Sequence, residues 1–197
     1  MNRPPPKPHC VPISHNTSIK MVSDFRKKKL QHVFNVFFDV DRSGSVDKKD
    51  FEAAVVKAAA VRGWKAGDAS YKDAEAVLNK IWAGLSSADA NNDGQVNFDE
   101  WVAVWEKSTD ADWQNAYAKF IFDLEDASAD GAIDGDEFST VYAAYGLSVD
   151  ESKAAFQKMS KGKANVSWAE FQALWKEYFT SEDVNAAGNS IFGKSSF

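Results

Sequence analysis

The sequence has little cysteine and no long apolar run. Its single cysteine, Cys10, cannot form an intramolecular disulfide, which fits a reducing compartment. No apolar stretch approaches the length of about 20 residues that a membrane-spanning helix needs. The N-terminal region lacks the apolar stretch of a secretory signal, so we expect a cytoplasmic protein.

An excess of basic side chains is also missing. The chain has 23 Lys and Arg against 29 Asp and Glu, a net charge of −6, whereas nucleic-acid binding needs a basic face. Nucleic acid is therefore excluded as the main partner. Hydrophobic residues make up 44% of the chain, enough for a core. The acidic residues gather in short Asp-rich stretches, which indicates sites for hard cations.

Apolar residues from Ser23 onward recur at spacings of three and four between these acidic stretches, as in amphipathic helices. Strand-like alternation is absent, so the predicted fold class is all-α. Residues 1–22, which contain prolines and no apolar periodicity, are expected to form a disordered tail. We expect residues 181–197 to form a C-terminal tail that packs on the core.

A loop pattern recurs four times, with starts at residues 39, 89, 126 and 159. Each loop lies between two helical patterns, which predicts four helix–loop–helix units in two pairs. The first pair spans residues 23–110, with loops 39–50 and 89–100. The second spans residues 111–180, with loop 126–137 and a degenerate loop 159–170.

The loops have the ligand spacing of the EF-hand. A twelve-residue calcium loop supplies oxygen atoms from positions 1, 3, 5, 7, 9 and 12 and turns at a glycine in position 6. Three loops satisfy this pattern. The predicted ligands are Asp39, Asp41, Ser43, Ser45, Asp47 and Asp50 in the first loop; Asp89, Asn91, Asp93, Gln95, Asn97 and Glu100 in the second; and Asp126, Ser128, Asp130, Ala132, Asp134 and Glu137 in the third. We therefore predict three Ca²⁺ sites.

The first and fourth loops are expected to differ from the other two in ion binding. Asp50 replaces the usual glutamate at position 12 of the first loop, and its shorter side chain favours Mg²⁺ there more than in the other loops. The fourth loop has Met159 at position 1 and Lys161 and Lys163 at positions 3 and 5, so we expect it to bind no cation. Its expected role is to keep Val166 paired with the third loop.

At this point the chain resembles the calexcitin and invertebrate sarcoplasmic calcium-binding protein family of the EF-hand superfamily. The resemblance covers residues 23–197 and rests on SDFRKKK at 23–29, VFFD at 36–39, DLED at 123–126, LWKEYF at 174–179 and GNSIFG at 188–193. It implies a compact globular arrangement of the four hands. It also implies neuronal calcium signalling, membrane ion channels as partners, and GTP binding.

Two further motifs leave other functions open. Residues 188–195 match the phosphate-binding pattern G-x-x-x-x-G-K-[ST], but no strand precedes them and only two residues follow, so Gly193 is better explained as a turn. Seven tryptophans could line a small-ligand or chromophore cavity, although His32 is the one histidine after the tail. Core packing explains the tryptophans equally well.

The predicted function is a calcium sensor that changes conformation when its three loops fill. The alternative is a cytosolic Ca²⁺/Mg²⁺ buffer; a GTP-binding regulator and a chromophore binder are more remote. No nucleophile–base set supports an enzyme. We expect a monomer. Three Ca²⁺ ions would cancel the formal charge of −6, and the basic run at residues 26–29 could then meet an anionic membrane, although a solvated face also explains this run.

Overall fold

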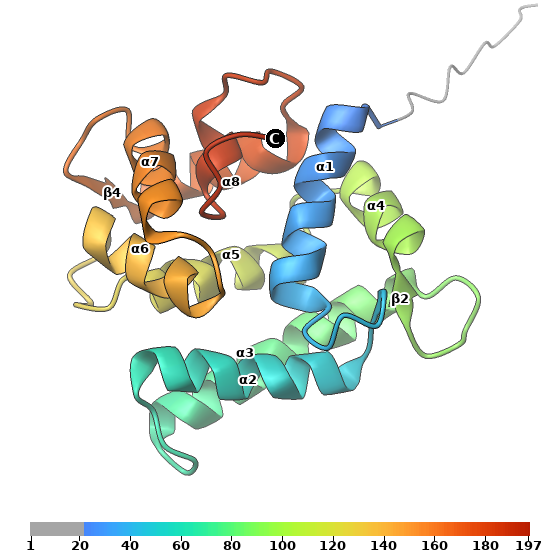
Figure 1. Ribbon diagram of the computed structural model, residues 1–197. Helices are drawn as coiled ribbons and strands as arrows, with labels where there is room; N and C mark the ends of the chain where they lie inside the picture. The colour runs from blue at the N-terminus through green and yellow to red at the C-terminus, as the bar shows by residue number, and fades with distance from the viewer. Residues whose placement is uncertain (1–21) are drawn as a thin grey trace, which may run out of the picture.

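The described part of the chain folds into helices joined by short loops, with four strands of two or three residues. A computed structural model describes residues 22–197 (Figure 1). The elements are α1 (Asp24–Val33), the π-helical turn η1 (Phe34–Phe38), β1 (Ser45–Val46), α2 (Lys48–Arg62), α3 (Ala69–Leu85), η2 (Ser86–Ala88), β2 (Val96–Asn97), α4 (Phe98–Lys107), α5 (Asp112–Glu125), β3 (Ala132–Asp134), α6 (Gly135–Ala144), α7 (Val149–Met159), β4 (Asn165–Ser167), α8 (Trp168–Thr180) and η3 (Ala187–Ser190). The predicted all-α class is confirmed. The expected N-terminal tail, except Val22, lies outside the described residues.

The four predicted helix–loop–helix units pair through their loops. Strand β1 pairs with β2, which places Val46 opposite Val96. Strand β3 pairs with β4, which places Ile133 opposite Val166. These valines and the isoleucine are at position 8 of each loop and are buried. The expected pairing of position 8 is therefore confirmed, and the fourth loop does support the third.

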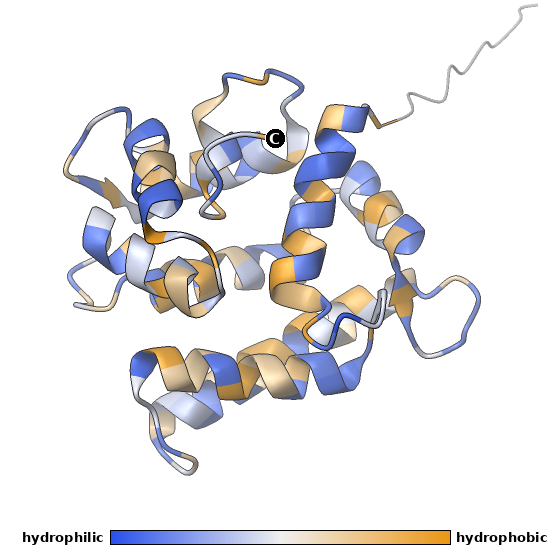
Figure 2. Ribbon diagram, in the orientation of Figure 1, coloured by the Kyte–Doolittle hydropathy of each residue, from blue (hydrophilic) through white to orange (hydrophobic). Residues whose placement is uncertain are grey.

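The core is rich in aromatic side chains from every helical unit, and apolar faces turn inward (Figure 2). Four tryptophan rings form a cluster in this core, with Trp105 at its centre. The Trp105 ring lies 5.4 Å from Trp101, 5.6 Å from Trp113 and 6.4 Å from Trp175, measured between ring centroids, and it stacks on Phe179 at 3.6 Å. Trp101 and Trp105 are fully buried. These rings join the first pair of hands to the second.

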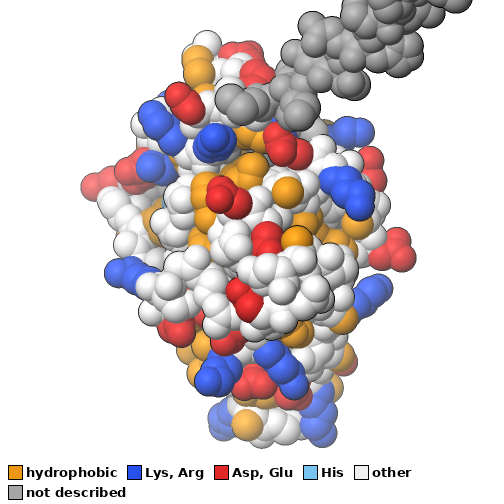
Figure 3. Space-filling model, turned by 90° about the vertical axis from the view of Figure 1, so that its right-hand side faces the viewer, with side chains coloured by type: hydrophobic (Ala, Val, Ile, Leu, Met, Phe, Trp, Pro, Cys, Tyr) orange, Lys and Arg blue, Asp and Glu red, His pale blue; other side chains and the backbone are white. Residues whose placement is uncertain are grey.

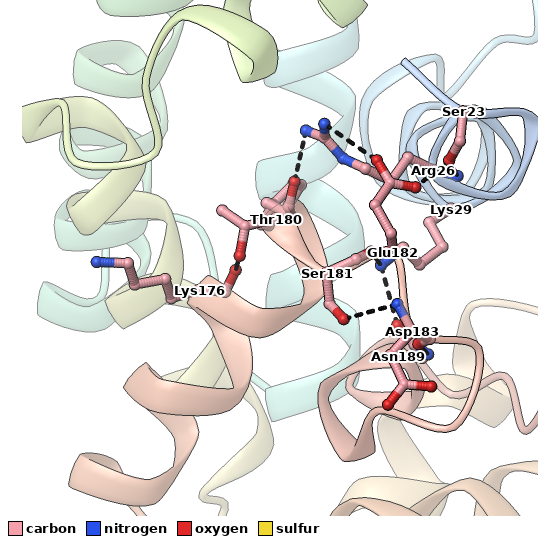
Figure 4. Close-up of polar contacts among 10 residues, drawn as sticks. Ser23, Arg26, Lys29, Lys176, Thr180, Ser181, Glu182, Asp183 and Asn189 are labelled. Atoms are coloured by element: carbon pink, nitrogen blue, oxygen red, sulfur yellow. Dashed lines mark hydrogen bonds and ion pairs between the residues drawn. The ribbon is translucent and has the colours of Figure 1, made fainter. Parts of the chain in front are cut away.

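The basic run at residues 26–29 does not form one solvated face. Arg26 Nη2 donates to the Phe179 carbonyl (2.8 Å), and Lys29 is buried with its Nζ donating to the Ser181 carbonyl (2.8 Å) and to Asn189 Oδ1 (2.9 Å) (Figure 4). This corrects the expectation that all four basic side chains face solvent or a membrane. Two of them instead fasten α1 to the last turn of α8 and to the segment after it.

The segment after α8 fills the space between α1, α6, α7 and α8. Ile191 and Phe192 are fully buried, and the Phe192 carbonyl accepts a hydrogen bond from His32 Nε2 (2.9 Å) when that nitrogen carries the proton. Gly193 turns the chain at φ 74°, and a Cβ there would lie 2.5 Å from the Tyr142 ring. Only glycine combines this φ with this close approach at no cost. Residues 188–193 are thus buried against the core, whereas residues 182–185 of the same segment are exposed.

The burial of Lys29 leads us to predict that the free energy of unfolding rises in alkaline solution. Burial, together with the positive charge of Arg26, lowers the pKa of Lys29 to about 8 from 10.5. Between these values the unfolded chain binds a proton that the folded chain has released, so stability rises with pH. The rise is at most about 1.4 kcal/mol per pH unit. Urea unfolding at several pH values should show this rise in the unmodified chain relative to Lys29→Met.

The exposed Lys28 provides the control for that experiment. Lys28→Met should keep the rise of stability with pH that is assigned to Lys29. Parallel stability curves for the unmodified chain and Lys29→Met would contradict the assigned pKa.

Acidic and basic side chains are interspersed over the face formed by α1, α4 and β2 (Figure 3). Among the described residues, no helix combines the length and the apolarity that crossing a membrane requires.

Candidate metal centres

The carboxylate at position 1 organises the turn in each of the three predicted loops. In the first loop, Asp39 Oδ1 accepts from Ser43 N (2.8 Å) and Oδ2 from Gly44 N (3.0 Å). Asp89 accepts in the same way from Asp93 N and Gly94 N, at 3.2 and 2.9 Å. Asp126 repeats the pattern with the amides of Asp130 and Gly131, at 3.2 and 3.0 Å. The turn therefore forms from the same residues three times.

The backbone of these turns also has a common form. Position 4 is left-handed in all three loops, at Arg42 (φ 61°), Asn92 (φ 60°) and Ala129 (φ 57°). The glycine at position 6 is left-handed too, with φ between 84° and 89°. Position 6 is the one that requires glycine, since residues with an L side chain rarely adopt such a φ.

The carboxylate at position 12 is turned back onto its own loop. Glu100 accepts from Ala90 N and from Asn97 N, both at 3.0 Å. Glu137 accepts from Ser128 N (2.8 Å) and Asp134 N (3.0 Å). The last predicted ligand thus lies close to the first part of the loop, as an oxygen shell around one ion requires.

Asp50 reaches the same position in the first loop despite its shorter side chain. Its Oδ1 accepts from Val40 N (2.9 Å) and Asp41 N (3.3 Å), and its Oδ2 accepts from Asp47 N (2.9 Å). One carboxylate oxygen from each of Asp39, Asp41 and Asp50 lies within 4.8 Å of the others. Burial raises the pKa of Asp50, while its three amide bonds oppose that rise.

Position 9 has a second role that the ligand spacing did not reveal. Asp47, Asn97 and Asp134 are the N-caps of α2, α4 and α6, and each side chain accepts from an amide in the first turn of its helix. An N-cap of this kind stabilises a helix by about 1 kcal/mol. The predicted ligand at position 9 therefore also fixes the start of the exiting helix.

The remaining predicted ligands lie on the exposed rim of the loops. Asp41, Asn91, Asp93 and Asp130 each accept an amide two residues ahead. At position 7, Ser45 Oγ donates to Gln95 Oε1 (2.7 Å), which links the first two loops. Ser128 Oγ lies 3.5 Å from Asp126 Oδ1, and Ala132 can offer only its carbonyl oxygen. The predicted ligands of each loop thus bond to the same turn, and among the described residues the first loop alone brings three carboxylate oxygens within 4.8 Å of one another.

These sets consist of carboxylate, amide, hydroxyl and carbonyl oxygens. Hard divalent cations bind such oxygens, and Ca²⁺ takes six to eight of them. Their charge also suits a cation, because the first and third loops each hold four carboxylates among the predicted ligands. The residues present therefore fit Ca²⁺ in all three loops.

The fourth loop already contains a cationic group. Lys163 Nζ donates to Glu170, the carboxylate at position 12, and lowers the pKa of that carboxyl to about 2. Its turn also differs: the left-handed residues are Lys161 (φ 54°) and Gly162 (φ 79°), at positions 3 and 4 instead of 4 and 6. The ammonium group and the shifted turn both disfavour a divalent ion here.

The G-x-x-x-x-G-K-[ST] segment offers few free amides to a phosphate. Gly188 N donates to the Glu177 carboxylate (2.6 Å), and Ser195 N donates to that of Glu151 (3.2 Å). Gly193 N donates to the Ser190 carbonyl (3.2 Å). Two carboxylates would repel an anion at this place, so the geometry favours the interpretation of this segment as a packed turn.

A buried carboxyl next to the third loop escaped prediction. Glu125 is fully buried, and Tyr142 Oη lies 2.6 Å from both Glu125 Oε1 and the Ile191 carbonyl oxygen. One hydroxyl proton cannot serve both bonds, so Glu125 carries a proton and donates one of them. Burial correspondingly raises the pKa of Glu125 well above its usual range. The available signal was helical phase, because Glu125 follows Ile121 and Leu124 on the apolar face.

Known proteins show the same architecture. The EF hand family model matches residues 30–56 and 84–105. Calexcitin-1 of Caenorhabditis elegans is 33% identical over 181 residues, covering 87% of this chain and 88% of the relative. Sarcoplasmic calcium-binding proteins I, III and IV of Branchiostoma lanceolatum are 30% identical, covering 88% and 98%. The solved structure of a sarcoplasmic calcium-binding protein from amphioxus has a TM-score of 0.75 at 28% identity, covering 88% and 99%.

Proposed function

The chain belongs to the calexcitin and sarcoplasmic calcium-binding protein family of EF-hand proteins, and from this premise we propose that it is a Ca²⁺ sensor with three active loops. The ions would be held by the oxygen sets of the first three loops. Bound Ca²⁺ would supply a fixed double positive charge at each loop centre. The fourth loop would act as a structural partner of the third.

The observation that carries the sensor proposal is the residue after each position-12 carboxylate. Phe51, Trp101 and Phe138 follow Asp50, Glu100 and Glu137, and all three aromatic side chains are buried in the core. Each ligand therefore shares the first turn of a helix with a core aromatic ring. A shift of the carboxylate toward an ion moves that ring as well, which converts binding into a change of packing.

A Ca²⁺/Mg²⁺ buffer is the second candidate, and one observation favours it. Each position-12 carboxylate already lies against its loop and accepts two or three amides. An ion entering a loop that is already closed would move its exiting helix little. Asp50 would also make the first loop tolerant of Mg²⁺.

Calorimetric titration with Ca²⁺, with and without millimolar Mg²⁺, separates the two candidates. Tryptophan fluorescence and binding of a hydrophobic dye are followed on the same samples, and light scattering checks the expected monomer. The sensor predicts three sites and new apolar surface when Ca²⁺ is added against Mg²⁺. Three sites without any change of surface would identify a buffer, and fewer than three sites would refute the site assignment.

The first loop provides a prediction about ion selectivity. Asp50→Glu should raise the preference of this loop for Ca²⁺ over Mg²⁺ by about tenfold, or about 1.4 kcal/mol. The reason is that the longer side chain can offer both carboxylate oxygens and complete a shell of seven ligands. Ca²⁺ accepts seven ligands, whereas Mg²⁺ requires an octahedral shell of six. Mg²⁺ competition titrations of the variant and the unmodified chain measure this ratio. The mirror variant Glu100→Asp should change the ratio of the second loop in the opposite direction.

We further propose that Ca²⁺ loading lets the protein approach an anionic membrane or a membrane ion channel. Three ions would cancel the formal charge of −6, and the exposed Lys27 and Lys28 lie on the accessible side of α1. Co-sedimentation with phosphatidylserine vesicles should increase with Ca²⁺ and fall in Lys27→Ala/Lys28→Ala. Binding that does not depend on Ca²⁺ would contradict this.

A further inference from the structure

Arg62 connects the first helix–loop–helix unit to the start of the third loop. It is the last residue of α2, and its guanidinium lies at the C-terminal end of α5. Nη1 donates to the carbonyl oxygens of Asp123 (2.6 Å), Leu124 (3.2 Å) and Asp126 (2.9 Å), and Nη2 donates to that of Ala127 (3.4 Å). The last carbonyls of a helix lack partners within it, and the helix dipole favours a cation there.

These carbonyls belong to the backbone that carries the first ligand of the third loop. Asp126 is position 1 of that loop and Ala127 is position 2. The Asp126 carboxylate is held by the amides of Asp130 and Gly131, whereas its carbonyl is held by Arg62. The place of this ligand therefore depends on a side chain from a different hand, 64 residues away in the sequence.

The guanidinium is itself held in place. Gly63 ends α2 in the left-handed conformation (φ 70°), and Trp64 N then donates to the Ala59 carbonyl (2.9 Å). This turn brings the Trp64 ring to 5.6 Å from Arg62 Cζ, a cation–π distance. The orientation of Arg62 thus follows the orientation of α2.

The C-terminal half of α2 also packs against the third unit. Ala58 forms a small buried cluster with Leu124 of α5 and Val141 of α6. Lys57 Nζ lies 4.0 Å from the centre of the Tyr145 ring, which follows α6. One end of α2 is therefore docked on the third hand.

The other end of α2 carries a ligand of the first loop. Asp50 is in its first turn, and Arg62 is its last residue. At a rise of 1.5 Å per residue the two are about 18 Å apart, so a tilt of about 5° at Asp50 moves the guanidinium by about 1.6 Å. Such a shift is enough to break hydrogen bonds of this length.

We infer that Arg62 is a positioning residue that couples metal binding at the first loop to the third loop, across the two pairs of hands. In this structure the Asp50 carboxylate is turned onto its loop while Arg62 is seated on α5. Metal binding at the first loop stabilises that orientation of α2 and therefore raises the Ca²⁺ affinity of the third loop. The inference rests on the proposed function, because both loops must bind Ca²⁺.

A thermodynamic cycle in the full chain tests the coupling. Glu100→Gln first disables the second loop, so that calorimetry reports the first and third loops alone. Disabling the first loop with Asp50→Ala should then weaken the third by about tenfold, within the usual range of coupling between sites. Arg62→Ala should abolish this dependence. It should also speed amide hydrogen exchange at the end of α5 in the metal-free protein.

Two further variants separate positioning from simple charge. Removing a cation near the loop would raise Ca²⁺ affinity by electrostatics, whereas loss of positioning lowers it. Arg62→Lys keeps the charge but loses the planar fork, so it should behave like Arg62→Ala. Arg26→Ala is the matched control, because Arg26 also donates to a carbonyl near a helix end, that of Phe179 in α8 (2.8 Å), but no metal loop follows there. It should leave the coupling intact.

The failures are distinguishable. Fewer than three Ca²⁺ sites in the unmodified chain would refute the proposed function and, if the first or third is missing, the coupling with it. Three sites with unchanged coupling in Arg62→Ala, or with full coupling in Arg62→Lys, would overturn only the role of Arg62. A higher affinity of the third loop in Arg62→Ala would overturn it as well.

Discussion

Phe192→Ala is expected to lower the free energy of unfolding by about 3–5 kcal/mol, as truncating a buried aromatic residue does. The Phe192 ring is fully buried between two halves of the molecule. It lies 5.4 Å from the Phe37 ring before the first loop, and 5.5 and 4.7 Å from the Trp175 and Tyr178 rings of α8. Equilibrium unfolding in guanidinium chloride, with a chelator present, measures the loss in the metal-free protein.

Val184→Ala is the control for this prediction. Val184 belongs to the same segment but is 65% exposed, so its truncation should change stability by less than about 0.5 kcal/mol. Equal effects of the two variants would show that the segment contributes through its backbone and not through the Phe192 ring. In Phe192→Ala we also expect faster amide exchange at residues 187–193, since the ring anchors this segment.

Glu137→Gln is expected to weaken Ca²⁺ binding at the third loop by about 30-fold or more, because removing one partner of a close charge pair costs about 2–5 kcal/mol. Glutamine offers one oxygen in place of two and carries no charge. It also replaces one of the two oxygens that accept from Ser128 N and Asp134 N by an NH₂ group. Calorimetry should therefore count one strong site fewer.

Glu170→Gln is the matched control in the fourth loop. Glu170 is at the same position 12 but is paired with Lys163. Its replacement should leave the number of Ca²⁺ sites unchanged. Loss of a site in Glu170→Gln would show that the fourth loop binds Ca²⁺ and would overturn its assignment as degenerate.

The fold class and the pairing of the loops could be predicted because the ligand pattern fixes the period of the chain. A loop with oxygen ligands at set positions requires a helix on each side, and its apolar position 8 requires a neighbour, which is the observed pairing of Val46 with Val96. The π-helical turn Phe34–Phe38 could not be predicted. Its residues continue the helical pattern, and the wider turn shows in the bond from Asp39 N to the Phe34 carbonyl (2.8 Å).

The candidate sites were less completely predictable than the fold. Ligand spacing identified the oxygen sets, but the bonds of Arg62 join residues more than 60 positions apart, and no local pattern encodes them. Lys29 was misjudged for a different reason. It looked like one of several equal basic residues, although Arg26, Lys29, Leu30 and Val33 share one helical face. A charged side chain on the apolar face of the helix was the signal that it has a buried partner.

The cluster of tryptophan rings in the core has a consequence for the optical properties of the protein. Trp101, Trp113 and Trp175 each lie within 6.4 Å of Trp105. Indoles this close exchange excitation energy before they emit, so emitted light is depolarised and its origin is shared among several helices. Quenching at any one ring then also lowers the emission of the other rings. The four residues would act as a single chromophore that responds to events in either pair of hands.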